Sequence, residues 1–359
     1  MNKKTFLRLD WALLTPVLIL IGISLTTLFS INPVFFKNQL IFTFISFVFL
    51  IIFSQVNYRI LESYETPIYL VSLFLLFIIL IVGIESHGAV RWLDLFGFRV
   101  QFSEIMKPFL MVSLASFLSR RKTNFKTFYL VLLLIIPLLI LIFKQPDLGN
   151  AVIFAIVVIL TLFVSGFSAR FFAGFFIAFI AILPVFWQFL HGYQKQRILT
   201  FINPSSDPLG ASYNVIQSVI AVGSGAFFGK GISQGTQSSL KFLPERHTDF
   251  IFATISENLG FVGSFLILLC FGFLLYRIYR LFLKSSNKFC KIFLASSFSL
   301  ILVQFFLNVG MNIGVVPVVG ITLPFVSYGG SSLLSNFIIL GLISSMNERF
   351  KNRDTLEIG

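Results

Sequence analysis

The chain has 359 residues, of which 57% are hydrophobic, 17% aromatic and only 11% charged. Soluble domains carry roughly a quarter charged residues, so this composition excludes a soluble enzyme and a disordered chain and favours a polytopic membrane protein. The net charge of +13 comes without a basic patch interleaved with exposed aromatic residues. We therefore expect no nucleic-acid partner and attribute the charge to membrane topology.

Apolar runs that approach the roughly 20 residues of a membrane span follow one another along the chain. Their continuous apolarity favours helices, because the strands of a barrel would alternate apolar and polar residues. The predicted fold class is all-α, a polytopic integral membrane protein with about ten transmembrane helices in a single domain over residues 1–359. The runs are residues 11–30, 40–54, 67–84, 103–119, 128–143, 148–165, 171–190, 250–276, 292–310 and 331–346.

An even number of spans places both termini on the same side of the membrane. When that side is taken as cytoplasmic, the inner loops carry more Lys and Arg than the outer loops, as the positive-inside rule requires. The connection between the seventh and eighth runs, about residues 191–249, is then extracellular and far longer than the others. Its apolar residues and glycines predict that it folds back on the membrane, with a short amphipathic helix at residues 214–222.

Ionisable residues inside a membrane are costly and are candidates for function. Glu104 and Lys107 begin the fourth run three residues apart, so they share one helical face and can pair. A structural ion pair and a charged lining of an outward cavity are both open, and the two readings are compatible. Glu257, deeper in the eighth run, is expected to be a hydrogen-bonded structural acid.

Asp249 lies where the long connection enters the eighth run, within Leu243-Pro-Glu-Arg-His-Thr-Asp-Phe-Ile-Phe252. Thr248 is placed to cap that helix, and helix N-terminal amides favour an anion there, so a structural carboxylate is one reading. The other is a carboxylate at the membrane surface that accepts a proton or holds a divalent cation. Helix counting puts Asp249 at a similar depth to Glu104 and Lys107 on the outer side.

Two glycine-rich segments lie on the same side. Residues 223–235 fail the phosphate-loop pattern, because three residues rather than four separate Gly225 from the Gly229-Lys230 pair. A tight surface loop with positive φ angles is expected there instead. Residues 315–330 combine Pro and Gly and cannot form a regular span, so we expect them to be part of a pocket wall or a lipid-facing slot.

These residues belong to a series of motifs that resembles RodA-type members of the SEDS family (shape, elongation, division and sporulation). The motifs occur in the family's order and span most of the chain, so the series is specific although no single motif is. The motifs are Gly88-Ala-Val-Arg-Trp-Leu-Asp94, Gln101-Phe-Ser-Glu-Ile-Met-Lys107, Lys144-Gln-Pro-Asp-Leu-Gly149, Gln194-Lys-Gln-Arg197, Asn203-Pro-Ser-Ser-Asp-Pro-Leu-Gly210, Gln217-Ser-Val-Ile-Ala-Val-Gly-Ser-Gly225, Leu243 to Phe252 and Pro324-Phe-Val-Ser-Tyr-Gly-Gly-Ser331.

The resemblance implies a peptidoglycan glycosyltransferase of the bacterial cytoplasmic (inner) membrane that polymerises lipid II on the outer face during cell elongation. The implied donor is the growing glycan strand on undecaprenyl pyrophosphate, and the implied acceptor is a sugar hydroxyl of lipid II. Asp249 is carried over as the essential carboxylate, with a divalent metal cation, Mg²⁺ or Mn²⁺, as cofactor. The implied partner is a class B penicillin-binding protein, a transpeptidase that crosslinks the strand.

The residues suit such chemistry, since the attacking hydroxyl must lose a proton and the leaving pyrophosphate must be neutralised. We interpret Asp249 as general base or metal ligand, with Glu104 and Lys107 shaping the cavity. Two other classes stay open, a lipid II flippase or transporter and a non-catalytic scaffold of the elongation machinery. The candidates for holding the pyrophosphate are the outer cations Arg91, Arg197, Lys230, Lys241 and Arg246.

Overall fold

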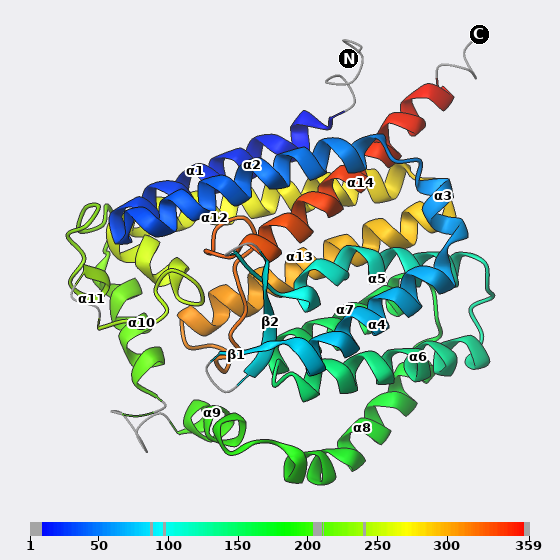
Figure 1. Ribbon diagram of the computed structural model, residues 1–359, viewed down its shortest axis with the longest axis horizontal. Helices are drawn as coiled ribbons and strands as arrows, with labels where there is room; N and C mark the ends of the chain where they lie inside the picture. Colours follow the sequence, from blue (N-terminus) through cyan, green and yellow to red (C-terminus); the bar gives the residue numbers. More distant parts are fainter. Residues whose placement is uncertain are drawn as a thin grey trace.

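The computed structural model describes residues 9–354, apart from 87–88, 96–97, 204–209, 211 and 240–241. It is mostly helical, and each predicted apolar run coincides with one helix (Figure 1). Within the described part, nine helices are long and apolar enough to cross a membrane, and α7 is a shorter apolar helix of 17 residues. With the short α3 (Tyr58–Ser63), these helices are α1 (Trp11–Ile31), α2 (Pro33–Gln55), α4 (Glu65–Val82), α5 (Phe102–Ser119), α6 (Phe125–Lys144), α7 (Leu148–Val164), α8 (Ala169–Phe189), α12 (Ile251–Lys284), α13 (Lys288–Asn312) and α14 (Gly330–Asp354).

The core of the bundle lies between α1, α2, α5, α12, α13 and α14. Leu13, Phe293 and Phe337, from three of these helices, are fully buried. α14 lies close along α2 because Gly341 has no side chain, and a Cβ there would sit 2.8 Å from the carbonyl oxygen of Leu50. Small residues permit such close approach in membranes, where apolar burial alone does not drive helices together.

α8 stands apart from this core at the edge of the molecule (Figure 1). Across its described residues, none of the side chains is buried by the rest of the protein, although nearly all are apolar. A helix of this kind is stable in lipid because its backbone hydrogen bonds are internal and its apolar side chains face lipid tails. The bundle therefore has a tightly packed half and a lipid-exposed edge.

Asp10 holds one end of the bundle together. Its carboxylate accepts hydrogen bonds from the Ala12 amide at 3.1 Å, from Arg277 of α12 at 2.7 and 3.1 Å, and from Asn347 of α14 at 2.8 Å. The first helix therefore begins close to where the last one ends, as an even number of spans requires. Following the predicted topology, we call this the inner end and the opposite end, which carries the long 191–249 connection, the outer end.

A small antiparallel sheet joins α4 to α5 at the outer end. Its strands, β1 (Ile84–Ser86), β2 (Ala89–Leu95) and β3 (Phe98–Val100), have the order β1-β2-β3, with Trp92 opposite Ile84 and Leu93 opposite Val100. The sequence analysis did not predict this sheet, because such short strands give too brief an alternation to distinguish from a loop. The sheet places Arg91, on β2, beside the outer ends of α5 and α7.

The long connection folds into three short helices, α9 (Gly192–Ile202), α10 (Tyr213–Ser224) and α11 (Thr236–Ser239), and α10 contains the predicted amphipathic helix. The glycine segment after α10 lies against α12 where that helix kinks at Gly260 (φ 66°, ψ −156°). There the amides of Phe261 and Val262 donate to the carbonyl oxygens of Ala226 and Phe227 at 2.9 and 3.2 Å. The expected surface loop therefore also completes the hydrogen bonding of a broken span.

Candidate active site

Asp249 lies at the outer end, two residues before α12 begins. The side-chain amides of Asn308 and Asn312, both on α13, donate to the Asp249 carbonyl oxygen at 3.1 and 2.9 Å. Asn312 also accepts a hydrogen bond from the Ala253 amide, in the first turn of α12, at 3.0 Å. Both asparagines are fully buried, so these bonds fix the position of Asp249 relative to α13.

The predicted capping of α12 by Thr248 is wrong. α12 starts at Ile251, and its N-cap residue Phe250 makes no side-chain capping bond. The amide of Phe250 instead closes a tight turn onto the carbonyl oxygen of Glu245 at 3.2 Å. This turn directs the Thr248 hydroxyl to the Glu245 carboxylate, at 2.8 Å, and away from the first-turn amides of the helix.

The Pro- and Gly-rich segment, residues 315–329, forms a wall beside Asp249. Gly320 in this wall has a φ of 70°, and a Cβ there would lie 3.4 Å from Asp249 Oδ2 and 3.9 Å from Arg197 Nη1. Arg197, on α9, also donates to the Val318 carbonyl oxygen at 3.4 Å. Asp249 and Arg197 therefore meet at one glycine, where a side chain would be strained and would crowd both groups.

The same segment anchors the chain just before Asp249. The Ser327 hydroxyl donates to the Thr248 carbonyl oxygen at 2.7 Å, and the Tyr328 amide donates to the His247 carbonyl oxygen at 2.9 Å. The His247 ring stacks on Phe35 of α2, with ring centroids 4.3 Å apart. Elements distant in the sequence thus hold the Asp249 backbone from several sides.

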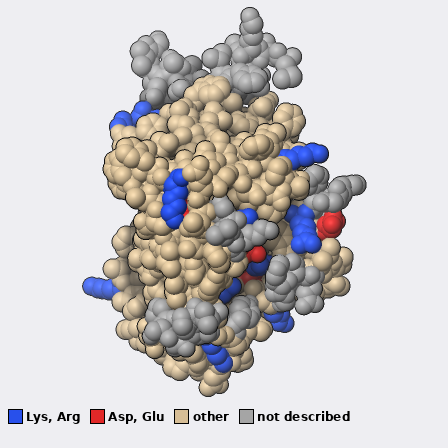
Figure 2. Space-filling model, turned by 90° about the vertical axis from the view of Figure 1, so that its left-hand side faces the viewer, with Lys and Arg blue, Asp and Glu red and all other residues tan. Residues whose placement is uncertain are grey.

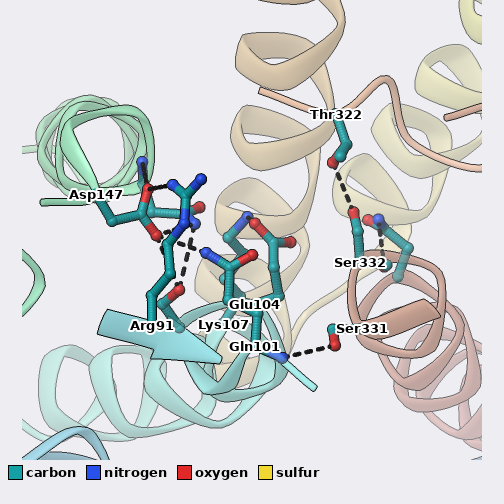
Figure 3. A network of polar contacts seen from close by, with 11 residues as sticks. Arg91, Gln101, Glu104, Lys107, Asp147, Thr322, Ser331 and Ser332 are labelled. Atoms are coloured by element: carbon teal, nitrogen blue, oxygen red, sulfur yellow. Dashed lines mark hydrogen bonds and ion pairs between the residues drawn. The ribbon is translucent and has the colours of Figure 1, made fainter. Parts of the chain in front are cut away.

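Asp147 is the centre of a second cluster at the outer end (Figure 3). Its buried carboxylate accepts hydrogen bonds from Gln101 at 2.7 Å, Ser103 at 3.1 Å and the Asn150 side chain at 2.9 Å. Arg91 lies 3.8 Å from the same carboxylate. Because Gln101 and Ser103 begin α5 while Asp147 caps α7, the cluster joins two helix starts and anchors Arg91 beside them.

The charges around Asp249 set its proton affinity. Burial raises the pKa of the Asp249 carboxyl from its ordinary value of 3.8 to about 6, and the Glu245 carboxylate contributes to the rise. The positive charges of Arg197 and Arg91 lower this pKa, whereas Asp147 raises it. The two clusters therefore act on one carboxyl, whose pKa is close to the pH range in which a general base works well.

Glu104 and Lys107 form the predicted ion pair, with Lys107 Nζ 2.6 Å from Glu104 Oε1 and both side chains buried. Figure 3 shows the pair between the Asp147 cluster on one side and Thr322 with Ser332 on the other. Oε2 of Glu104 is buried and has no hydrogen-bond partner among the described residues. The pair thus supports the outer end of α5 and places an acceptor beside the Asp147 cluster.

Lys230 does not join the Asp249 cluster. It forms an ion pair with Glu257 of α12 at 3.3 Å, and the Gln237 amide donates to the same carboxylate at 2.9 Å. Glu257 is fully buried, so it is the hydrogen-bonded structural acid that the sequence analysis predicted. Lys230 neutralises that acid and ties the glycine segment to α12.

The other expected cations are placed differently. Arg91 and Arg197 lower the pKa of the Asp249 carboxyl, and Arg246 is partly buried. Lys241 lies outside the described residues. Figure 2 shows the outer end, where acidic and basic side chains meet in a hollow near the middle of the face.

Three residues that build this geometry had no role in the sequence analysis: Asp147, Asn308 and Asn312. Asp147 stands directly before an apolar run, which is the pattern of a helix N-cap. Asn308 lies near the end of the ninth apolar run and Asn312 follows four residues later, so they share one helical face if the helix continues. Each pattern was a detectable signal, but neither indicates which residue the side chain contacts.

The apolar bundle with a charged hollow at one end defines a multi-pass membrane protein. A family model for FtsW, RodA and SpoVE, described as a cell cycle protein, matches residues 4–352. The chain is 36% identical to the peptidoglycan glycosyltransferase MrdB of Escherichia coli K12, covering 98% of this chain and 97% of that one. It is 34% identical to the stage V sporulation protein E of Bacillus subtilis 168, covering 96% and 98%.

Solved structures agree with this assignment. A chain from a structure on the coordination of polymerization and crosslinking by a peptidoglycan synthase complex matches with a TM-score of 0.83 and 31% identity, covering 95% of this chain and 98% of that one. The rod shape determining protein RodA of Thermus thermophilus matches with a TM-score of 0.71 and 28% identity, covering 95% and 97%. The chain belongs to the FtsW/RodA/SpoVE family, which confirms the SEDS prediction, and it is a multi-pass inner-membrane protein.

Proposed function

We propose that this chain, a peptidoglycan glycosyltransferase, polymerises lipid II on the outer face of the membrane with Asp249 as its general base. This role is supported by the pKa of the Asp249 carboxyl, which is about 6, and by its position beside Arg197 at the Gly320 wall. A general base needs a pKa near the operating pH and a fixed position. The backbone bonds from Asn308 and Asn312 supply that position.

In this mechanism the acceptor is a sugar hydroxyl of lipid II. Asp249 takes the hydroxyl proton while the hydroxyl oxygen attacks the anomeric carbon of the donor strand, and the bond from that carbon to undecaprenyl pyrophosphate breaks. The electron pair of that bond leaves with the pyrophosphate. The positive charges of Arg197 and Arg91 lower the pKa of Asp249. We assign to these two arginines the stabilisation of the departing negative charge.

A divalent cation fits these residues only as a species shared with the substrate. Among the described residues, no group of three or more His, Cys, Asp or Glu side chains is placed to hold a metal. Mg²⁺ is commonly held by one or two carboxylates together with substrate phosphates, and Asp249 with the nearby Glu245 provides that many. Bound there, Mg²⁺ or Mn²⁺ would supply positive charge to the pyrophosphate. Asp249 would then be its principal protein ligand.

A class B penicillin-binding protein is the proposed partner. The similar structure of a peptidoglycan synthase complex concerns both polymerization and crosslinking. A polymerase whose site lies at the outer end of the bundle would release its strand where a transpeptidase can crosslink it. This arrangement supports an assembly of the two proteins on the outer face.

The test is a polymerisation assay with the full chain, purified with its cognate class B penicillin-binding protein. Labelled lipid II and Mg²⁺ or Mn²⁺ are added, and glycan polymers are resolved on a gel. We expect polymer from the wild type and from Glu62→Gln, which alters a carboxylate at the inner end, but not from Asp249→Asn. Treatment with a chelator should stop the reaction, and either cation should restore it.

Each part of the proposal has its own contradicting outcome. Polymer formation by Asp249→Asn at the wild-type rate would contradict both proposed roles of Asp249, general base and metal ligand. An unchanged rate in the presence of a chelator would contradict the metal requirement. Transbilayer movement of lipid II in liposomes, with no polymer from any variant, would instead indicate a flippase. Restoration of rod shape in cells by a folded Asp249→Ala protein would indicate a scaffold.

A further inference from the structure

A pocket between α4, α5, α6 and α7 lies in the inner half of the bundle, away from Asp249. Its cavity volume is about 210 Å³. It extends from Glu65 and Arg121, at the inner ends of α4 and α5, to residues near the middle of these helices. The apolar residues that line its deep part are Leu110, Leu114, Val131, Leu138, Phe154 and Val157.

The deep part of this pocket suits an apolar guest. Cavities lined by such side chains stay dry and accept apolar molecules. The polar groups in its wall already have partners, since the Tyr69 hydroxyl donates to the Leu134 carbonyl oxygen at 2.6 Å and the Ser113 hydroxyl donates to the Glu65 carbonyl oxygen at 3.0 Å. The wall therefore offers apolar contact area and has no unpaired hydroxyl at Tyr69 or Ser113 that a ligand would need to satisfy.

The inner mouth of the pocket is polar and basic. A second, polar pocket shares Glu65, Thr66 and Arg121 with the first one and adds Arg120. Arg121 is held by the Glu65 carboxylate at 3.0 Å and lies over the Phe117 ring, 3.5 Å from its centroid. The Arg121 guanidinium is thus fixed at the point where the apolar cavity reaches the inner end, and Arg120 beside it donates to the Glu62 carbonyl oxygen.

Both guanidiniums keep donors for a further ligand. Each has five N–H groups, and the hydrogen bonds found in the described part of the chain use Nη2 of Arg120 and Nη1 of Arg121. Lys288 adds positive charge close by, because its Nζ donates to the Arg121 carbonyl oxygen at 2.7 Å. Lys122 is exposed in the same loop, so cations outnumber acids around the mouth.

We propose that this pocket binds an anionic phospholipid of the inner leaflet. One acyl chain lies between α4, α5, α6 and α7, and the phosphate is bound by Arg120 and Arg121. Arginine binds phosphate with paired, charge-assisted hydrogen bonds, and basic residues at a membrane surface favour anionic over zwitterionic lipids. Because α5 also carries Glu104 and Lys107 at its outer end, the lipid contacts a helix that frames the outer site.

Native mass spectrometry of the purified full chain tests this site directly. The protein is incubated with equal amounts of phosphatidylglycerol and phosphatidylcholine, and the lipid retained on the protein is measured. We expect phosphatidylglycerol to exceed phosphatidylcholine by about 10-fold or more. The double variant Arg120→Gln/Arg121→Gln should lose this preference, whereas Arg170→Gln, an exposed inner-end cation at the start of α8, should keep it.

A second variant tests the acyl chain without changing charge. Leu114→Trp fills the apolar part of the pocket and should reduce retention of both lipids, while thermal unfolding confirms that the variant is folded. Equal retention of the two lipids by the wild type would overturn the proposal, as would an unchanged preference in the double arginine variant. Displacement of phosphatidylglycerol by inorganic phosphate alone, or preferential retention of undecaprenyl phosphate, would also overturn it.

Discussion

Two aspartates at opposite ends of the bundle both precede long helices, yet their surroundings differ. At the inner end, the Asp10 carboxylate accepts hydrogen bonds from Ala12, Arg277 and Asn347. At the outer end, Asn308 and Asn312 bind the backbone carbonyl of Asp249. The first arrangement uses the carboxylate to join helices, whereas the second holds the residue by its backbone and leaves the carboxylate oxygens for another partner.

The other membrane carboxylates extend this comparison. Asp147 and Glu257 resemble Asp10, because each is buried and accepts several hydrogen bonds from fixed donors. Asp249 differs because its backbone carbonyl oxygen, rather than its carboxylate, accepts the bonds from Asn308 and Asn312, and because it lies beside an arginine at the Gly320 wall. An acid inside a membrane is therefore not by itself a sign of catalysis, and the number of donors on its oxygens separates the two kinds.

The largest expected effect on the polymerisation rate comes from exchanging Asp249 for a neutral residue. Asp249→Asn should lower the polymerisation rate by about 100-fold or more, because a general base contributes roughly 10²–10⁴-fold. Its thermal unfolding temperature should stay near that of the wild type. Initial rates of glycan formation and unfolding curves in the same detergent measure both quantities.

Asp10→Ala is the matched variant at the inner end. It should lower the free energy of unfolding by about 1–3 kcal/mol, because it leaves Arg277 without its carboxylate partner. The polymerisation rate of the folded fraction should remain that of the wild type. A loss of rate equal to that of Asp249→Asn would show that the two aspartates do not differ in the way proposed.

The next effect concerns the asparagines that position Asp249. Asn312→Ala removes bonds to both the Asp249 carbonyl oxygen and the Ala253 amide, so the rate should fall by about 10-fold or more through misplacement of the base. Gln304→Ala, also on α13, is the control, because the side-chain atoms of Gln304 have no hydrogen-bond partner among the described residues. Equal polymerisation rates for Asn312→Ala and Gln304→Ala would contradict the proposed positioning role of Asn312.

The pH dependence of the rate sharpens the comparison further. A base with a pKa of about 6 is protonated below this pH, so the rate should rise as pH increases through about 6 and then level off. Arg197→Gln removes a charge that lowers the pKa and should move this midpoint upward. Glu245→Gln removes a charge that raises the pKa and should move it downward. Rates between pH 5 and 8 measure the midpoint separately from any loss of maximal rate, and a midpoint that moves the other way would contradict the assignment.

The smallest effect on polymerisation is expected for Lys230. Lys230→Met leaves the buried Glu257 with fewer partners and should lower the free energy of unfolding by about 1–3 kcal/mol, with the rate per folded molecule nearly unchanged. The double variant Lys230→Met/Glu257→Gln should recover part of this stability, because the unpaired charge is removed. A large increase in KM for lipid II, without loss of stability, would instead place Lys230 at the pyrophosphate.

Local sequence patterns predicted much of this protein. The apolar runs predicted the long helices, because an apolar stretch of the right length in a bilayer satisfies its backbone only as a helix. The three-residue spacing of Glu104 and Lys107 predicted their ion pair, since both lie on one face of one helix. Thr248 shows the limit of local rules, because a tight turn to Glu245 moved its hydroxyl away from the helix start.

Other features depended on how the helices came together. The sequence named five outer cations, but only the fold shows that Arg197 and Asp249 both approach Gly320, while Lys230 neutralises Glu257. Each of these arrangements brings together residues that are far apart in the chain. Helix packing, rather than sequence periodicity, decides which residues become neighbours. The local sequence thus determines where each helix forms. The environment of Asp249, and with it the elevated pKa, arises only when α9, α13 and the 315–329 segment pack around it.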